Sequence, residues 1–249
     1  DGGGFLFGLA YDHFIAGGDS IVVLMKDLHD AYVDPQRFAP RRLGLYPAAY
    51  GRLLFRHALR VLTGLPGLVD LVKSCRTTAR PRYREGVPAD NAFLLKHVDA
   101  PTLAQALSTA KQWGITLNDL LLALLLQAMA PLAGERKGGR RRAMAAASIL
   151  NLRGDFQPPA TTVFGQFLSS FRVTHAMPAG QELAALARDV RAQTRRTKER
   201  KLYLQTLLGI AGSGLVWRHL SPESRARFHA RNYPVWGGVT LLNVDALWR

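Results

Sequence analysis

The sequence predicts a mixed α/β fold, and three observations favour this class. Segments with the alternating pattern of strands interleave irregularly with segments that carry apolar residues at helical spacing, without repeats or heptads. The 249 residues are 48% hydrophobic, which suffices for one large domain or two modest ones. Residues 75–88 are polar, basic and proline-containing, and they lack periodicity, as a linker does. We therefore expect two half-domains, residues 1–88 and 89–249.

The first half is predicted to contain one strand and two helical regions. Residues 5–13 alternate as a strand, with the odd-numbered side chains on one face. A helix capped by Asp19 or Ser20 follows, with apolar positions from Ile21 to Leu28. Residues 50–72 are helical in pattern, with an expected interruption at the glycine and proline residues of 64–67.

The second half alternates between the two kinds of element. We expect strands at 92–98, 144–150, 164–174 and 238–244. We expect a helix opened by a capping box at 102–105, a buried helix from Thr116 to about Ala130, and further helices over 181–201, over 204–216 and from Pro222.

Charge and cysteine content narrow the choice of partners. Lys and Arg number 33 against 18 Asp and Glu, and the net charge of +15 favours an anionic partner such as nucleic acid, anionic lipid, an acidic carrier protein or coenzyme A. No zinc-finger or RNP-like pattern is present, so specific nucleic-acid recognition is disfavoured.

The single cysteine, Cys75, excludes an intrachain disulfide, and the histidines show no metal-ligand spacing, so we expect no metal. We expect a cytoplasmic protein, since no signal-peptide pattern and no apolar run of membrane-span length occurs.

One histidine stands out. His13 ends the strand-like run and is followed by the pair Gly17 and Gly18 at a helix start. An imidazole at such a strand-to-turn junction can project into a cleft and act as a base near neutral pH. A backbone-bonded histidine at a strand end is the structural alternative.

Residues 13–20 resemble the His-x-x-x-Asp-Gly motif of acyltransferases that share the chloramphenicol acetyltransferase and condensation-domain fold. Other segments resemble that superfamily in the same order: a Thr-x-Asn-Asp helix start, a strand ending in Asn-x-Arg, a Gly-Asn-Phe segment and a late Ser/Thr-Asn-Val strand, which correspond here to 116–119, 148–153, 165–167 and 240–244. The resemblance implies a two-layer α/β sandwich of two half-domains that is incomplete at both ends.

The resemblance also implies an activity: transfer of an acyl group from a coenzyme A or carrier-protein thioester to an alcohol or amine. Wax ester synthases, alcohol acetyltransferases and peptide-synthetase condensation domains belong to this group. No permanently bound cofactor is implied. The expected partners are a small-molecule or lipid acceptor, an acidic carrier protein and, for a lipid acceptor, a peripheral membrane contact. A peptide-synthetase condensation domain and a degenerate, non-catalytic binding relative remain the alternatives.

By the same resemblance, His13 is the general base. The family's aspartate, which pairs with an arginine and holds the histidine loop, is replaced here by Gly17, while Arg153 matches the partner arginine. We predict that Asp19 turns back to Arg153 and takes over this role. Gly17, Gly18, Thr240 and Asn243 are expected at the substrate or oxyanion, with ladder and turn positions as the alternative for Thr240 and Asn243. Arg195 and Lys198 are the candidates for cofactor binding, although the basic run that contains them is favoured as a solvated helix face. For Asn118 and Asp119, helix capping is the favoured interpretation.

Overall fold

The computed structural model describes residues 4, 6–13, 15–40, 50–81, 93–133, 141–156, 163–176 and 178–248. They form two compact units. Unit 1 comprises Asp1–Arg56, Asn151–Leu168 and Leu241–Arg249, and unit 2 comprises His57–Leu150 and Ser169–Thr240. The predicted half-domain boundary at residues 88 and 89 lies outside the described residues, so that division stays a prediction.

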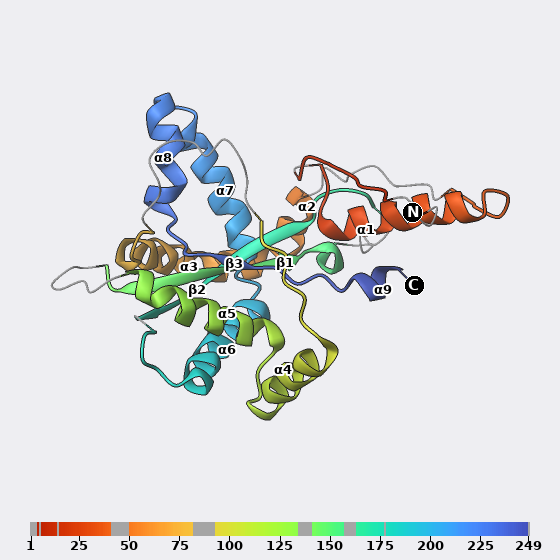
Figure 1. Ribbon diagram of the computed structural model, residues 1–249. Coiled ribbons are helices and arrows are strands. Elements are labelled where there is room, and N and C mark those ends of the chain that lie inside the picture. Colours follow the sequence, from red (N-terminus) through yellow and green to blue (C-terminus); the bar gives the residue numbers. More distant parts are fainter. Residues whose placement is uncertain are drawn as a thin grey trace. The chain divides into compact units, whose positions relative to one another are not determined.

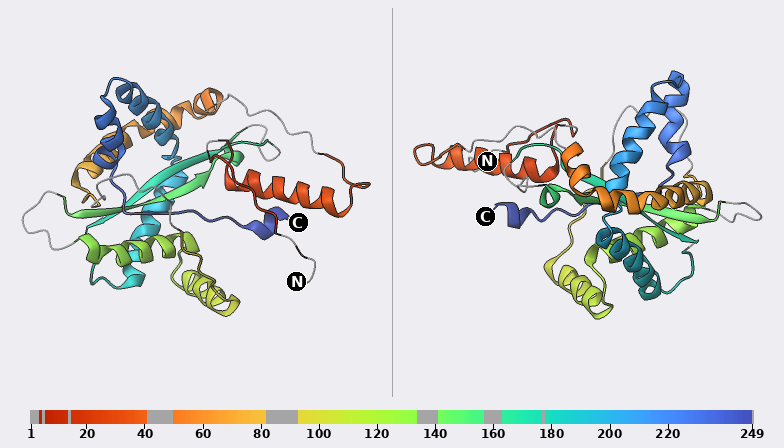
Figure 2. Two further views of the ribbon diagram at one scale, coloured as in Figure 1. Left: turned by 45° about the horizontal axis from the view of Figure 1, so that its top comes forward. Right: turned by 180° about the vertical axis from the view of Figure 1, so that it is seen from behind.

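Unit 2 is built on a three-stranded sheet of order β2-β1-β3. The strands are β1 (Ala143–Asn151), β2 (Leu168–Ala176) and β3 (Gly238–Val239), and β3 runs parallel to β1 with Gly238 opposite Ala147. Three predicted strands are thus present, although the last is much shorter than the predicted 238–244. Figures 1 and 2 show α5 and α6 on one side of this sheet and α3 and α7 on the other.

The core of unit 2 lies between the sheet and the pair α5 (Leu117–Met129) and α6 (Leu183–Glu199). As predicted, α5 is a central helix, and Leu122 and Leu126 are fully buried. Thr116 and Asp119 form a reciprocal capping box that satisfies two N–H groups of the first turn. The capping box therefore marks where α5 begins, and its apolar residues account for its burial in the core.

The remaining helices of unit 2 correct several expectations. They are α3 (Ala58–Thr77), α4 (Ala100–Gln112), α7 (Leu204–Trp217) and α8 (Pro222–Asn232). The expected interruption at 64–67 is wrong, because α3 continues with Pro66 inside it and the break falls at His57. The expected linker is also wrong at its start, since Cys75 is a buried residue of α3. The cap of α4 is Asp99, which accepts from the N–H of Thr102 at 2.9 Å, rather than the predicted box at 102–105.

Unit 1 contains α1 (Gly18–Val33), α2 (Tyr50–Arg56), a short 3-10 turn, η2 (Arg153–Asp155), and α9 (Val244–Trp248). Helix α1 packs against α9, with the rings of His29 and Trp248 5.8 Å apart. The predicted cap of α1 is wrong: the N-cap residue is Gly17, and no side chain caps the helix. Asp19 and Ser20 are thereby released for other contacts.

Two predicted strands do not form. Residues 6–12 and 93–98 have no ladder partner among the described residues, and their large apolar side chains are exposed. Leu6 and Phe93, for example, are more than 90% exposed. An alternating pattern describes a surface that suits a sheet, but a strand exists only where a neighbouring strand accepts its hydrogen bonds.

Among the described residues, no single helix has both the length and the apolar character needed to span a membrane. The helices Ala100–Gln112 and Leu117–Ala133, bent by 99° to one another, meet that length and composition criterion only as a pair.

Candidate active site

Arg153 is the centre of a hydrogen-bonded network in unit 1. It lies on η2, directly after the end of β1, and its side chain is only 10% exposed. Its Nε donates to Asp19 Oδ2 at 2.6 Å, while its Nη2 donates to Ser20 Oγ and, at 3.3 Å, to the carbonyl of Gly165. Its guanidinium also stacks over the Phe167 ring, 4.4 Å from the centroid. A buried cation is held by a carboxylate, neutral oxygens and an aromatic face, as such a charge requires.

The Asp19 carboxylate is the anionic partner in this network. Besides Arg153, it accepts from Asn151 Nδ2 at 2.9 Å and from the N–H of Ser20 at 3.0 Å. Asn151 in turn accepts from the N–H of Arg153 at 2.9 Å, so that both ends of the sequence Asn151-Leu152-Arg153 hold the same carboxylate. The predicted contact between Asp19 and Arg153 is present.

Gly17 makes room for this arrangement. Its φ of −77° is ordinary for any residue, so the backbone conformation does not require glycine. A Cβ at this position would instead lie 2.9 Å from Asp19 Oδ1, closer than carbon and oxygen atoms pack. The Gly17 N–H donates to the Gly165 carbonyl at 3.1 Å. The space that a side chain at position 17 needs is therefore occupied by the carboxylate from position 19.

Ser20 belongs to the network as well, although its position in the sequence predicts only a helix cap. It is buried, and its hydroxyl donates to the Gly165 carbonyl at 3.0 Å while it accepts from the Gly165 N–H at 3.2 Å and from Arg153. A signal was available in the sequence, because a serine follows Asp19 directly and residues 165–167 resemble the Gly-Asn-Phe segment of the superfamily. A glycine at 165 lets a second backbone segment approach this hydroxyl closely.

His13 precedes the network on the same loop and is exposed. Its Nδ1 lies 3.0 Å from the carbonyl oxygen of Ala16, which can only accept, so in the neutral ring Nδ1 carries the proton and Nε2 carries the lone pair. The ring also contacts Tyr11 edge-on, with the centroids 6.0 Å apart. Ala16 is fully buried and is followed by Gly17, so the histidine is tied to the anchored part of the loop.

The other predicted residues have local roles in the described structure. Gly18 begins α1, and a Cβ there would lie 3.3 Å from Leu242. Asn243 accepts from the N–H of Ala246 at 3.0 Å and thereby caps α9. Thr240 is exposed in unit 2. Their assignment to a substrate or oxyanion stays a prediction.

Arg195 and Lys198 are both exposed on α6. Arg195 forms an ion pair with Glu199 at 2.7 Å, four residues further along the helix, and this hydrogen bond raises its pKa. The guanidinium is therefore already engaged on the helix surface. Cofactor binding by these two residues stays a prediction.

The side chains of the Thr-x-Asn-Asp segment, residues 116–119, have structural roles. Asp119 is fully buried and accepts from both Thr116 and Thr194, each at 2.6 Å, with Arg191 3.5 Å away. Asn118 exchanges hydrogen bonds with Ser148 on β1 at 3.2 and 3.3 Å. The favoured interpretation, helix capping, is confirmed for Asp119.

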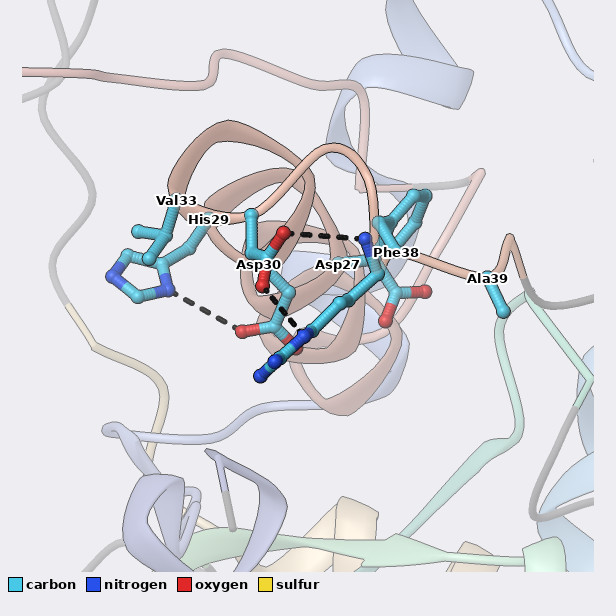
Figure 3. Close-up of a pocket in the computed structure, with 8 residues that line it drawn as sticks. Asp27, His29, Asp30, Val33, Phe38 and Ala39 are labelled. Atoms are coloured by element: carbon cyan, nitrogen blue, oxygen red, sulfur yellow. Dashed lines mark hydrogen bonds and ion pairs between the residues drawn. The ribbon is translucent and has the colours of Figure 1, made fainter.

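A separate hollow lies at the C-terminal end of α1 (Figure 3). Two of its carboxylates are paired: Asp30 binds Lys26, which lies outside the lining, at 2.5 Å and contacts His29 at 3.4 Å, and Asp34 pairs with Arg37. The hydrogen bond from Lys26 lowers the pKa of Asp30. Across the described ranges, no group of His, Cys, Asp and Glu side chains is arranged to hold a metal ion.

Comparison with known proteins places the fold. No family model matches the sequence, and no curated protein matches it. Among solved structures, the epimerization domain from the third module of tyrocidine synthetase B is similar over 78% of this chain, with a TM-score of 0.58 and 20% identity. The first condensation domain of the calcium-dependent antibiotic synthetase is similar over 93%, with a TM-score of 0.58 and 13% identity. The X-domain complex with OxyB from teicoplanin biosynthesis is similar over 90%, with a TM-score of 0.54 and 18% identity.

These similarities confirm the predicted fold class: the chain has the chloramphenicol acetyltransferase-like α/β fold of condensation domains. The chain spans about half the length of these structures, between 45% and 50% of each.

Proposed function

We propose that this chain carries the histidine-bearing part of an acyl-transfer domain of the condensation-domain type. Its substrates would be an acyl or peptidyl thioester, on a carrier protein or coenzyme A, and an amine or alcohol acceptor. The observation that carries the proposal is the Asp19–Arg153 ion pair of 2.6 Å, which anchors the loop that presents His13. A buried ion pair costs desolvation free energy, and fixing the position of His13 is a role that would account for this cost.

His13 is the proposed general base. With Nδ1 bound to the Ala16 carbonyl, Nε2 is available to accept the proton of the acceptor amine or hydroxyl. The acceptor nitrogen or oxygen then bonds to the thioester carbonyl carbon, the carbon–sulfur bond breaks, and the thiol leaves with a proton returned from Nε2. Arg153 and Asp19 touch no reacting atom in this scheme and act as positioning residues.

The test is a single-turnover assay of the full-length protein with a panel of acyl thioesters and acceptors. His13→Ala should lower the rate at least about a hundredfold, as expected for a general base. The unfolding transition should stay where it is, because an exposed imidazole contributes little packing. His219→Ala, at a histidine of unit 2, is the matched control. Equal rates for the parent protein and the His13→Ala variant would rule out His13 as the general base.

A second candidate, a binding relative without turnover, is favoured by a specific observation. His13 follows residues 6–12, which are exposed and form no strand, so the described residues do not enclose the imidazole. One similar structure is a domain in complex with another protein, OxyB. Saturable binding of an acyl thioester by the full-length protein, without any product, would support this candidate.

A further inference from the structure

Unit 2 contains a polar hollow that shares no residue with the Arg153 network. It has a volume of about 200 Å³ and lies between α3, β2 and the start of α7. Its lining is rich in hydroxyl groups and nitrogen donors, and includes Ser74, Arg172, Thr174, Thr197, Gln205 and Tyr233. The alternation of β2 explains how a cation comes to face it: Phe171 and Val173 enter the hydrophobic core, so Arg172 projects from the opposite face.

Arg172 lacks an anionic partner, because no Asp or Glu of the described residues forms an ion pair with it. Its guanidinium donates only to neutral acceptors: at 2.8 Å to Cys75 Sγ and to the carbonyl of Pro234, at 3.0 Å to Thr78 Oγ1 and at 3.4 Å to Ser74 Oγ. It also lies over the Tyr233 ring, 4.9 Å from the centroid. Burial lowers the pKa of this arginine, which indicates that the protonated form is incompletely compensated.

Two donors of the lining have no acceptor within the part of the chain that the structure describes. They are Nε of Arg172 and Nε2 of Gln205, and both atoms are buried. A buried donor without a partner costs free energy that an incoming acceptor would recover. An anion with several oxygen atoms can satisfy a guanidinium, an amide and hydroxyl groups together.

A second hollow of about 370 Å³ adjoins the first, and the two share Gly67, Asp70 and Leu202. Three arginines line it: Arg60, Arg196 and Arg200. The two carboxylates of the combined lining are Asp70 and Glu199, and Glu199 is already paired with Arg195 at 2.7 Å. The two hollows therefore form one groove with an excess of positive charge.

We propose that this groove, the Arg172 groove, binds a phosphate-bearing small molecule, with one phosphate group at Arg172 and further negative charge at the three outer arginines. The Nε–H of Arg172, which has no acceptor among the described residues, can donate to one phosphate oxygen, and hydroxyl and amide groups of the lining supply further bonds. The inner hollow is too small for a drug-sized ligand and accommodates a single anionic group. Pyrophosphate should therefore bind more tightly than phosphate, and acetate should bind weakest.

The experiment is calorimetric titration of the full chain with inorganic phosphate, pyrophosphate and acetate at constant ionic strength. Arg172→Gln should weaken phosphate binding about tenfold or more, as expected for loss of a charge-assisted hydrogen bond. Asp70→Asn should strengthen it, because a carboxylate of the lining repels the ligand. Arg188→Gln is the matched control, an exposed arginine of α6 outside both hollows, and should leave the affinity unchanged.

Equal phosphate affinity in the Arg172→Gln and Arg188→Gln variants overturns the proposal, as does acetate binding as tight as that of phosphate. If Arg172→Gln fails to fold, as seen by circular dichroism, Thr197→Val and Asp70→Asn carry the test. The first should weaken phosphate binding and the second should strengthen it, and no change in either overturns the site. The titration measures no acyl transfer, so its outcome is independent of the role of His13.

Discussion

The carboxylate of Asp19 lies 2.6 Å from Nε of Arg153, although 134 positions separate the two residues in the chain. The resembled motif carries its carboxylate at position 17, where this chain has glycine. In this chain the carboxylate that pairs with Arg153 lies on the first turn of α1, and position 17 has no side chain. The two features fit together, because a Cβ at position 17 would lie 2.9 Å from Asp19 Oδ1.

Replacing Asp19 should destabilise the protein, because it leaves the buried guanidinium of Arg153 without an anionic partner. Asp19→Asn keeps the shape but removes the negative charge beside Arg153, so we expect the free energy of unfolding to fall by about 3 kcal/mol. Urea denaturation measures this loss. Glu199→Gln is the control, because it breaks an ion pair that is exposed to solvent and should therefore cost much less. Similar losses for the two variants would contradict the buried-pair interpretation.

A side chain at position 17 should displace the Asp19 carboxylate. Gly17→Ala puts a Cβ 2.9 Å from Asp19 Oδ1, and we expect a loss of about 1–3 kcal/mol. Gly17→Asp should cost more, since it places two carboxylates together, and Asp19→Gly in the same chain should restore much of the loss. Gly154→Ala, where a Cβ would meet nothing within 4 Å, is the control for thermal unfolding. Full stability of Gly17→Ala would show that the carboxylate is not confined.

Stability should fall at high pH because of Tyr233. Burial raises the pKa of this phenol from 10.0 to about 12. Below pH 10 both the folded and the unfolded chain keep the proton, so the pKa difference costs nothing. Between about pH 10 and pH 12 the unfolded chain loses the proton first, and stability falls by at most about 3 kcal/mol. Tyr233→Phe should flatten this decline in urea denaturation measured across that window, and an unchanged slope would contradict the prediction.

The contact between α3 and α7 should depend on Gly64. A Cβ at this position would lie 1.7 Å from Nε2 of the buried Gln205, so Gly64→Ala should destabilise unit 2 by about 1–3 kcal/mol. Adding Gln205→Ala should recover part of this loss. Gly51→Ala in α2, where a Cβ has open space, should instead stabilise the protein by about 0.5–1 kcal/mol. Calorimetric melting of the three variants distinguishes close packing from a general effect of glycine in helices.

The sequence by itself determined the elements whose signals are local. Thr116 and Asp119 mark the start of α5 within three residues, and the apolar pattern of that helix predicts its central position. The contact of Asp19 with Arg153 was also predictable, because a buried arginine needs a carboxylate and one stood two residues from the vacated position. Fold class followed from the order of several short motifs.

The tertiary structure decided what depends on distant partners. Residues 6–12 and 93–98 have the pattern of strands but no strand beside them, while residues 238 and 239 form β3 only because β1 lies parallel to them. Ser20 became part of the site because the backbone of Gly165 comes to its hydroxyl. The neighbours of Arg172 are set by the tertiary structure too, since its contacts come from two segments far apart in the chain, residues 74–78 and 233–234. Caps and periodicity act over one or two turns, whereas strand pairing and burial of charge depend on segments far apart in the chain.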